Sequence, residues 1–247
     1  MNKDIFIDHF KNTGVEAEKI FAAQKIAKAC HKHMETFLRP GLTQKQIHEE
    51  CERFMLSKGA ESFWTHNDAA LILFGDLTKY SAHESPGSLY DGMTLRENDL
   101  ITIDTAPAIG TGWGDMARSY IMENGRLVSW KDCQNPEIRE GMEMEMKLHE
   151  LFVRSVKDDT TFADIYKITD DYLTSHGYVN LDYHGNFGHS IENRPEDRIT
   201  IINTSDIIIS EYNKPITFEP HICKKNGKYG IKHENMYFYV NGRIKKL

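Results

Sequence analysis

The sequence predicts an α+β fold of two similar halves, in which helices pack on a curved antiparallel sheet. Each half begins with a pair of amphipathic helical segments, and strand-like segments follow each pair. Thr43 and Gly59 recur 118 positions later as Thr161 and Gly177, and two apolar positions between them keep the same spacing. One constant spacing over four positions favours an internal repeat.

In the first half, apolar residues recur every three or four positions over 15–38, which predicts a long helix. Pro40-Gly41 ends it. Thr43 and Gln46 have the spacing of a capping box, so a second helix is expected from Thr43 to about Lys58. Gly59 follows as its stop signal.

The second half repeats this order. A helix is expected over 136–157, and Thr161 with Asp164 begins another helix that ends at Gly177. Strands are expected over 69–74, 100–104 and 116–122 in the first half, and over 199–202, 207–209, 215–223 and 229–240 in the second. Asn226-Gly227 and Asn241-Gly242 are typical of two-residue hairpin turns.

Composition narrows the class of protein. The chain has 247 residues, of which 40% are hydrophobic and 27% charged, with a formal net charge of −7. This negative charge argues against a nucleic-acid partner and against docking on an anionic membrane. The start of the chain has no signal-peptide core, and no run of about 18 apolar residues occurs, so a cytoplasmic protein is expected.

Four cysteines, Cys30, Cys51, Cys133 and Cys223, lie far apart and form no CxxC pair. They are expected to be reduced structural thiols rather than a disulfide framework or a zinc site. The sequence does not settle the oligomeric state, and a homodimer is one assembly that it allows.

Two pairs of carboxylates are the informative part of the strands. Asp104 ends a strand, a glycine-rich turn over 110–114 follows, and Asp115 begins the next strand, so the two aspartates are expected to approach each other. In a hairpin with Asn226 and Gly227 as loop residues, Glu219 lies directly opposite Glu234. Like charges placed opposite each other destabilise a sheet unless a proton or a cation lies between them.

His189, in Gly-His-Ser-Ile, adds an imidazole to these four carboxylates. The mixed oxygen and nitrogen set suits Mn, Fe, Co or Zn ions. The sequence therefore predicts a metal site built from residues of both halves.

These motifs resemble the family of methionine aminopeptidases, Xaa-Pro aminopeptidases, prolidases and creatinases. Asp104 lies in Ile-Asp-x-x-Pro, Asp115 in Gly-Asp-Met-Ala-Arg, His189 in Phe-Gly-His-Ser-Ile, Glu219 in Thr-Phe-Glu-Pro, and Glu234 in Gly-x-x-x-Glu, in the family's order. The resemblance implies the pita-bread fold, with residues 1–247 forming a single catalytic domain and no extra N-terminal domain.

The resemblance also implies a site for two divalent metal ions that activate water for hydrolysis. Asp104 would hold one ion and Asp115 would bridge both. His189 and Glu219 would hold the other ion, and Glu234 would form a second bridge. Glu219 would also carry protons during the reaction.

Further site residues are expected around this centre. His83, in His-Glu-Ser-Pro, is similar to the family histidine that contacts the substrate and the reacting group. Glu196 stands where peptidase members carry a second histidine, so His184 or His221 is expected to supply that hydrogen bond. Trp113 is expected to border the substrate. Lys232-His233 precedes Glu234 where prolidase-like members usually have an arginine.

The function implied first is an Xaa-Pro-type aminopeptidase or dipeptidase that acts on a small peptide or small molecule. Removal of initiator methionine is an alternative, although 63–81 has no cysteine of the kind that branch often has in its methionine pocket. A non-peptide C–N hydrolase and a di-iron oxidative enzyme also stay open. A binding module without catalysis is disfavoured because all five ligand positions are filled.

Overall fold

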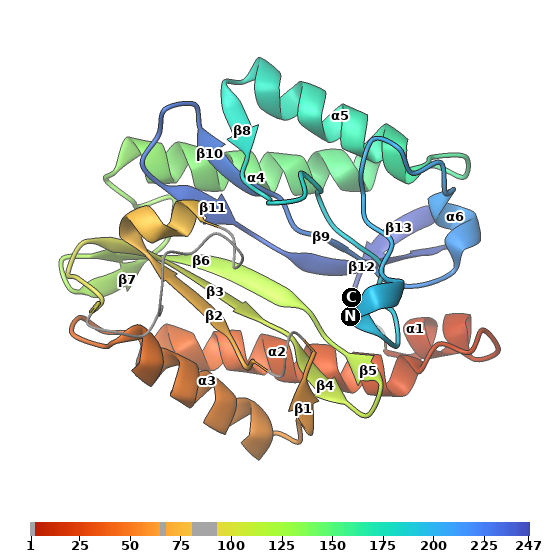
Figure 1. Ribbon diagram of the computed structural model, residues 1–247, viewed down its shortest axis with the longest axis horizontal. Helices are drawn as coiled ribbons and strands as arrows, with labels where there is room; N and C mark the ends of the chain where they lie inside the picture. Colours follow the sequence, from red (N-terminus) through yellow and green to blue (C-terminus); the bar gives the residue numbers. More distant parts are fainter. Residues whose placement is uncertain (1–2, 65–67, 81–92) are drawn as a thin grey trace.

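A computed structural model describes residues 3–64, 68–80 and 93–247 of the chain. It confirms the α+β architecture: two helical layers lie on opposite sides of the molecule, with the antiparallel sheets between them (Figure 1). Helices α2 and α3 form one outer layer, and α4 and α5 form the other. Among the described helices, none combines the length and the apolar character needed to cross a membrane.

The described residues of the first half form three α-helices, one 3-10 helix and two small sheets. Its helices are α1 (Lys3–Phe10), α2 (Ala17–Phe37) and α3 (Gln44–Ser57). A four-stranded sheet has the order β2 (Leu71–Phe74), β3 (Asp99–Thr105), β6 (Met116–Glu123), β7 (Arg126–Val128), and the 3-10 helix η1 (Gly75–Lys79) follows β2. A three-stranded sheet has the order β1 (Ser62–Phe63), β4 (Pro107–Ile109), β5 (Gly112–Trp113).

The second half contains α4 (Pro136–Ser155), α5 (Phe162–Ser175), the 3-10 helix η2 (Pro195–Asp197) and the short α6 (Ile209–Tyr212). One sheet has the order β11 (Gly230–Lys232), β10 (His221–Lys224), β8 (Tyr178–Asn180). The other has the order β13 (Arg243–Lys246), β12 (Asn235–Val240), β9 (Ile216–Phe218).

Both capping boxes are present. The Thr43 hydroxyl accepts from the Gln46 N–H, and the Gln46 side chain accepts from the Thr43 N–H. Thr161 and Asp164 make the same pair of bonds at the start of α5. These bonds satisfy donors that a helix N-terminus otherwise leaves free, which is why the two helices begin where the sequence indicates.

The predicted hairpin register is also correct. His221 lies opposite Lys232 in the β10–β11 pair, and Phe218 lies opposite Asn235 in the β9–β12 pair. In both pairs the numbers of the two opposed residues have the same total, and this is also the total for Glu219 and Glu234. The two glutamates therefore occupy corresponding positions between these pairs. The expected long strands are interrupted here because Pro220 has no backbone N–H to donate and Glu234 donates to Ala117 in the other half.

Two expectations for strands are wrong. Residues 199–202 and 207–209 form no strand and contribute only isolated bridges, His189 to Thr200 and Thr161 to Ile208. Their β-branched residues pack on the core from irregular backbone and from the start of α6. Helix α1, which the sequence analysis did not identify, buries Phe6 and Phe10 against Phe238 of β12.

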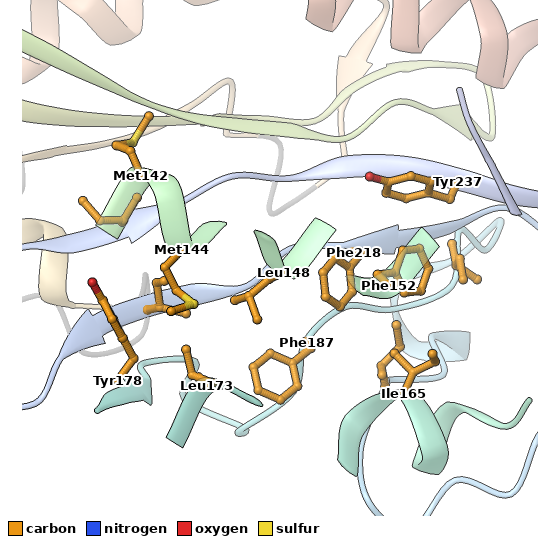
Figure 2. Close-up of a cluster of buried hydrophobic side chains, with 14 of the residues drawn as sticks. Met142, Met144, Leu148, Phe152, Ile165, Leu173, Tyr178, Phe187, Phe218 and Tyr237 are labelled. Atoms are coloured by element: carbon orange, nitrogen blue, oxygen red, sulfur yellow. The ribbon is translucent and has the colours of Figure 1, made fainter. Parts of the chain in front are cut away.

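The larger hydrophobic core fills the second half, between α4, α5 and the sheets (Figure 2). Phe152 of α4 stacks on Phe218 of β9, with ring centroids 4.4 Å apart. Leu148 and Ile165 contribute fully buried side chains from the two helices. Phe218 directly precedes Glu219, so this packing fixes the strand that carries a predicted ligand.

The two halves join where β6 meets the end of β11. Arg118 and His233 form an isolated antiparallel bridge, and the Arg118 guanidinium donates to the carbonyls of Ala117 and Glu234. It also donates to Asn235 Oδ1 over 2.7 Å. Arg118 therefore links the two hairpins through backbone and amide groups.

A buried histidine braces the hairpin in each half. His31 of α2 pairs with the Tyr120 hydroxyl at 2.7 Å and the Met116 carbonyl at 2.9 Å. His149 of α4 pairs with the Tyr237 hydroxyl at 2.8 Å and the His233 carbonyl at 2.8 Å. Burial is the main reason that the pKa of each imidazole falls to about 3.

Candidate metal centre

The first pair of carboxylates comes from the β3–β6 hairpin. Asp104 lies opposite Ala117, and Asp115 directly precedes β6, two positions before Ala117 and on the same face. Burial, followed by the charges of Asp104 and Glu219, raises the pKa of Asp115 well above its ordinary value. The aspartates thus approach each other closely enough to repel.

The side chain of Gln24, buried in α2, holds the backbone of Asp115 in place. Gln24 Nε2 donates to the Asp115 carbonyl over 3.1 Å, and Gln24 Oε1 accepts from the Asp115 N–H over 2.8 Å. Gly114 allows this approach, since a Cβ there would lie 2.5 Å from the Gln24 backbone nitrogen. The glycine-rich turn therefore fits Asp115 tightly against α2.

The second pair of carboxylates is held from both halves. The Glu219 N–H donates to the Phe187 carbonyl over 2.9 Å. The Glu234 N–H donates to the Ala117 carbonyl over 3.0 Å, so this bond crosses from one half to the other. Glu234 is only 1% exposed and lies near Asp115 as a result.

His189 presents a ligand nitrogen toward these carboxylates. Its Nδ1 lies 3.0 Å from the Ser190 carbonyl, which can only accept, so the proton resides on Nδ1. Nε2 is then the unprotonated nitrogen, and it lies 3.3 Å from Glu219 Oε1 and 3.6 Å from Asp115 Oδ2. Burial is the main cause of the lowered pKa of His189, and it favours the neutral ring that a metal ion requires.

Three of the predicted ligands meet the spacing for one metal ion. Among the described residues, one donor atom each from Asp115, His189 and Glu234 lie within 4.8 Å of one another. Both carboxylate oxygens of Glu234 are buried, and neither has a hydrogen-bond partner in the described part of the chain. Because a buried carboxylate without a partner is costly, and because this donor set suits Mn, Fe, Co or Zn, the residues fit a divalent ion.

The other two predicted ligands are paired with a lysine. Lys232 Nζ lies 2.6 Å from Asp104 Oδ2 and 2.9 Å from Glu219 Oε2. Burial lowers the pKa of Lys232, but the charges of Asp104, Glu219 and Glu234 outweigh it and raise the pKa well above its ordinary value. Lys232 is therefore a buried ammonium ion inside the carboxylate cluster.

The centre opens into a cavity of about 170 Å³. Its apolar wall includes Trp64, Leu71, Leu73 and Tyr80. The polar lining includes residues of the centre and Thr102, Asp182, Tyr183, His184, Asn186, Arg198, Thr200 and His221. The Arg198 guanidinium lies 4.8 Å from the centroid of the Trp64 ring, which adds a cation near the centre.

Of the remaining predicted site residues, some line the cavity and others do not. His184 and His221 both line the cavity, and His221 Nε2 donates to the Thr78 carbonyl over 2.7 Å. Trp113 is 1% exposed and stacks behind Trp64 with centroids 3.6 Å apart, so Trp64 is the indole in the cavity lining. His83 lies outside the described residues.

Glu196, at the position of the family's second histidine, is in the exposed turn η2. Its carboxylate lies 3.8 Å from Arg194 Nε, and both side chains are about two-thirds exposed. Within the described residues, the cavity lining does not include Glu196. Glu196 therefore does not take the place of that histidine at the centre.

In the sequence Lys232 stands out only as a departure from the family pattern, and Arg198 and Trp64 are not identified as parts of the site. Lys232 could have been found, because it lies two positions before Glu234 and so shares its strand face. Arg198 lies in irregular backbone after η2 and carries no local signal. Trp64 directly follows β1, and only the packing of β1 on β4 brings it to the centre.

Comparison with known proteins gives matches to metallopeptidases and other peptidases, which agrees with a metal centre. The family model for metallopeptidase family M24 matches residues 18–240. An uncharacterized peptidase of Bacillus subtilis, YqhT, is 26% identical over 168 residues, which are 68% of this chain and 41% of the relative. The chain thus spans less than half the length of that relative.

Solved structures show the same fold. The X-Pro aminopeptidase of Thermotoga maritima has a TM-score of 0.76 at 19% identity, covering 94% of this chain and 59% of that chain. A methionine aminopeptidase of the same organism has a TM-score of 0.74 at 13% identity, covering 93% of this chain and 94% of that chain. Prolidases are also among the structural neighbours. The chain belongs to metallopeptidase family M24 and has the pita-bread fold.

Proposed function

We propose that this chain is a metal-dependent hydrolase that cleaves the N-terminal peptide bond of a small peptide, with Xaa-Pro substrates preferred. The observation that carries the proposal is the convergence of Asp115, His189 and Glu234 beside a cavity, in a chain of family M24. The Xaa-Pro preference is supported by the structural likeness to an X-Pro aminopeptidase and to prolidases.

Each residue of the centre has a chemical task in this proposal. A bound divalent ion would polarise the substrate carbonyl and make a water molecule more acidic. Asp115, His189 and Glu234 hold the ion. Burial raises the pKa of Glu219, but the charge and hydrogen bond of Lys232 outweigh it and lower the pKa, so Glu219 stays ionised and can accept the proton of the attacking water.

The cavity favours a short substrate. Its volume of about 170 Å³ suits a few residues at most, and Leu71 and Leu73 give it an apolar wall. Arg198 lies in the same lining, so its guanidinium can pair with a substrate carboxylate. Together these features support a dipeptide or tripeptide whose C-terminal carboxylate lies within reach of Arg198.

Removal of N-terminal methionine is the second candidate. It is favoured by the likeness to the methionine aminopeptidase of Thermotoga maritima, of which this chain covers 94%. Cleavage of Met-Ala-Ser and of Ala-Pro, compared with added Mn²⁺ or Co²⁺, distinguishes the two functions. Faster turnover of Ala-Pro supports the Xaa-Pro reading, and faster turnover of Met-Ala-Ser supports the other.

The control is the same protein after chelation by EDTA, which we expect to abolish both activities until Mn²⁺ or Co²⁺ is restored. Failure to cleave either peptide in any metal form would contradict both functions. In that case metal analysis with a test of oxygen consumption would address the C–N hydrolase and di-iron alternatives.

Other expectations stay predictions alongside this proposal. These are the contact of His83 with the substrate and a homodimer. We also propose a cytoplasmic location, because Cys30, Cys51, Cys133 and Cys223 are all buried free thiols, which suits a reducing compartment.

A further inference from the structure

The position of Lys232 bears on how many ions the centre binds. Its ammonium makes two charge-assisted bonds, one to Asp104 from the first half and one to Glu219 from the second. All three side chains are less than one-fifth exposed. The ammonium therefore fills the position between two carboxylates where a cation would otherwise be needed.

The carboxylates divide into two groups around this ammonium. Glu219 directs Oε2 toward Lys232 and Oε1 toward His189. Asp115 and Glu234 offer their donor atoms on the His189 side, where both oxygens of Glu234 have no hydrogen-bond partner among the described residues. Only this second group has buried oxygens that still need a positive charge.

The charges of the centre also favour one divalent ion over two. Asp104, Asp115, Glu219 and Glu234 together carry four negative charges when ionised. One divalent ion and the Lys232 ammonium leave one negative charge on these four carboxylates, and the cavity wall adds the Arg198 guanidinium and the Asp182 carboxyl group. A second divalent ion would make the cluster positive and would lie beside a buried ammonium, where like charges repel strongly.

We infer that Lys232 takes the place of a second metal ion, and that the centre binds one divalent ion at Asp115, His189 and Glu234. This inference rests on the metal centre of the proposed function. It goes further by fixing the number of ions and by giving Lys232 the role of a built-in cation for Asp104 and Glu219.

The test is metal content, independent of activity. Purified chain is stripped with EDTA and equilibrated with Mn²⁺, and bound manganese per chain is measured by elemental analysis and by titration calorimetry. We expect one Mn²⁺ in the wild type and the separate six-line electron paramagnetic resonance signal of an isolated ion. Lys232→Met frees both carboxylates, so we expect two Mn²⁺ and the signal of a coupled pair.

Two control variants sharpen the result. Lys232→Arg keeps the positive charge and should bind one Mn²⁺. Lys228→Met removes an exposed lysine of the same hairpin, which pairs with Asp76 outside the cavity, and should also bind one Mn²⁺. Circular dichroism confirms that each variant is folded, and the wild-type count tests the inference even if Lys232→Met does not fold.

The outcomes separate the two proposals. Two coupled Mn²⁺ ions in the wild type would overturn the inference and leave the metal centre intact. One Mn²⁺ in a folded Lys232→Met would also overturn the inference. No bound Mn²⁺ in the wild type, in a protein that is folded, would overturn the metal centre of the proposed function and the inference with it.

Discussion

The two halves of the molecule share a scaffold of helices and a hairpin, and they differ in the residues that the hairpin carries. In each half a histidine from the long helix, His31 or His149, bonds to a strand tyrosine and to a strand carbonyl at nearly equal distances. Each half also has a second helix that begins with a capping box. The two histidines and the two capping threonines keep the 118-residue spacing of the repeat, whereas the two tyrosines are 117 positions apart.

The hairpins of the two halves are where the chemistry diverges. In the first, Asp104 lies opposite Ala117, whereas in the second Glu219 occupies a position corresponding to Glu234. Lys232 occurs only in the second hairpin, and its ammonium reaches across to Asp104. Buried histidine–tyrosine pairs therefore support the hairpins in both halves, while a few strand positions decide the charge of the centre.

The largest effect should come from the ligand that belongs to the first half. Asp115→Asn keeps the shape but removes the charge, so Mn²⁺ binding and peptide cleavage should fall by more than the about 10- to 100-fold typical of an outer-shell partner. Calorimetry and a peptide assay measure both. Stability of the metal-free protein should rise, because one of the repelling carboxylates is gone. Unchanged Mn²⁺ affinity would show that the centre lies elsewhere.

The next largest effect should come from the buried histidine of each half, and it tests whether the two histidines are equivalent. His31→Ala and His149→Ala should each lower the free energy of unfolding by about 2–4 kcal/mol, because each leaves a cavity and buried hydrogen-bonding groups without partners. Urea unfolding measures this. A loss of stability in one half and none in the other would show that the two histidines are not equivalent. Tyr120→Phe and Tyr237→Phe, which remove only the hydroxyl, should cost about 1 kcal/mol each.

The same histidines predict a pH dependence. The pKa of His149 is about 3 in the folded protein, below its ordinary value of 6.5, so the unfolded chain takes up a proton first as the pH falls. The stability contributed by neutral His149 is complete above pH 6.5 and is lost toward pH 3. The stability difference between wild type and His149→Ala should therefore shrink by up to about 1.4 kcal/mol per pH unit below pH 6.5. His31→Ala should behave alike, and a difference that is independent of pH would contradict the neutral, buried state.

The smallest effect concerns the caps. Thr43→Ala and Thr161→Ala should each cost about 1 kcal/mol in the free energy of unfolding, because each removes the acceptor of a helix N–H. The backbone and side-chain bonds from Thr161 lower the pKa of Asp164, so the second box is at full strength above the ordinary value of 3.8 and should weaken as the pH falls below it. Equal pH dependence in both halves would argue against this difference.

Much of the fold could be predicted because its signals are local. The capping boxes follow from two residues each, and the turn at Asn226-Gly227 predicts the register that relates Glu219 to Glu234. The strands expected over 199–202 and 207–209 were wrong because β-branched residues can also pack on a core from irregular backbone. Helix α1 was missed because its stability comes from packing on Phe238 rather than from its short apolar pattern.

In the candidate site, too, residues with a local signal could be predicted, and residues placed by tertiary packing could not. Its acidic residues and His189 stand out because each lies beside a strand end or a glycine turn. The pairing of Lys232 with Asp104 could not be predicted, since the two residues are 128 positions apart and meet only when the halves dock. Arg198 reaches the cavity from a loop that has no periodic pattern, and its contact with Trp64 depends on tertiary packing.

The indole stack beside His189 gives this protein an optical reporter of its own. Trp64 and Trp113 lie face to face, and each ring centroid is within 6 Å of the His189 imidazole, at 5.9 and 5.8 Å. Occupancy of the neighbouring site by a paramagnetic ion such as Mn²⁺ or Co²⁺ should quench their fluorescence. The affinity of the centre can then be followed by emission, without a label and without any knowledge of the substrate.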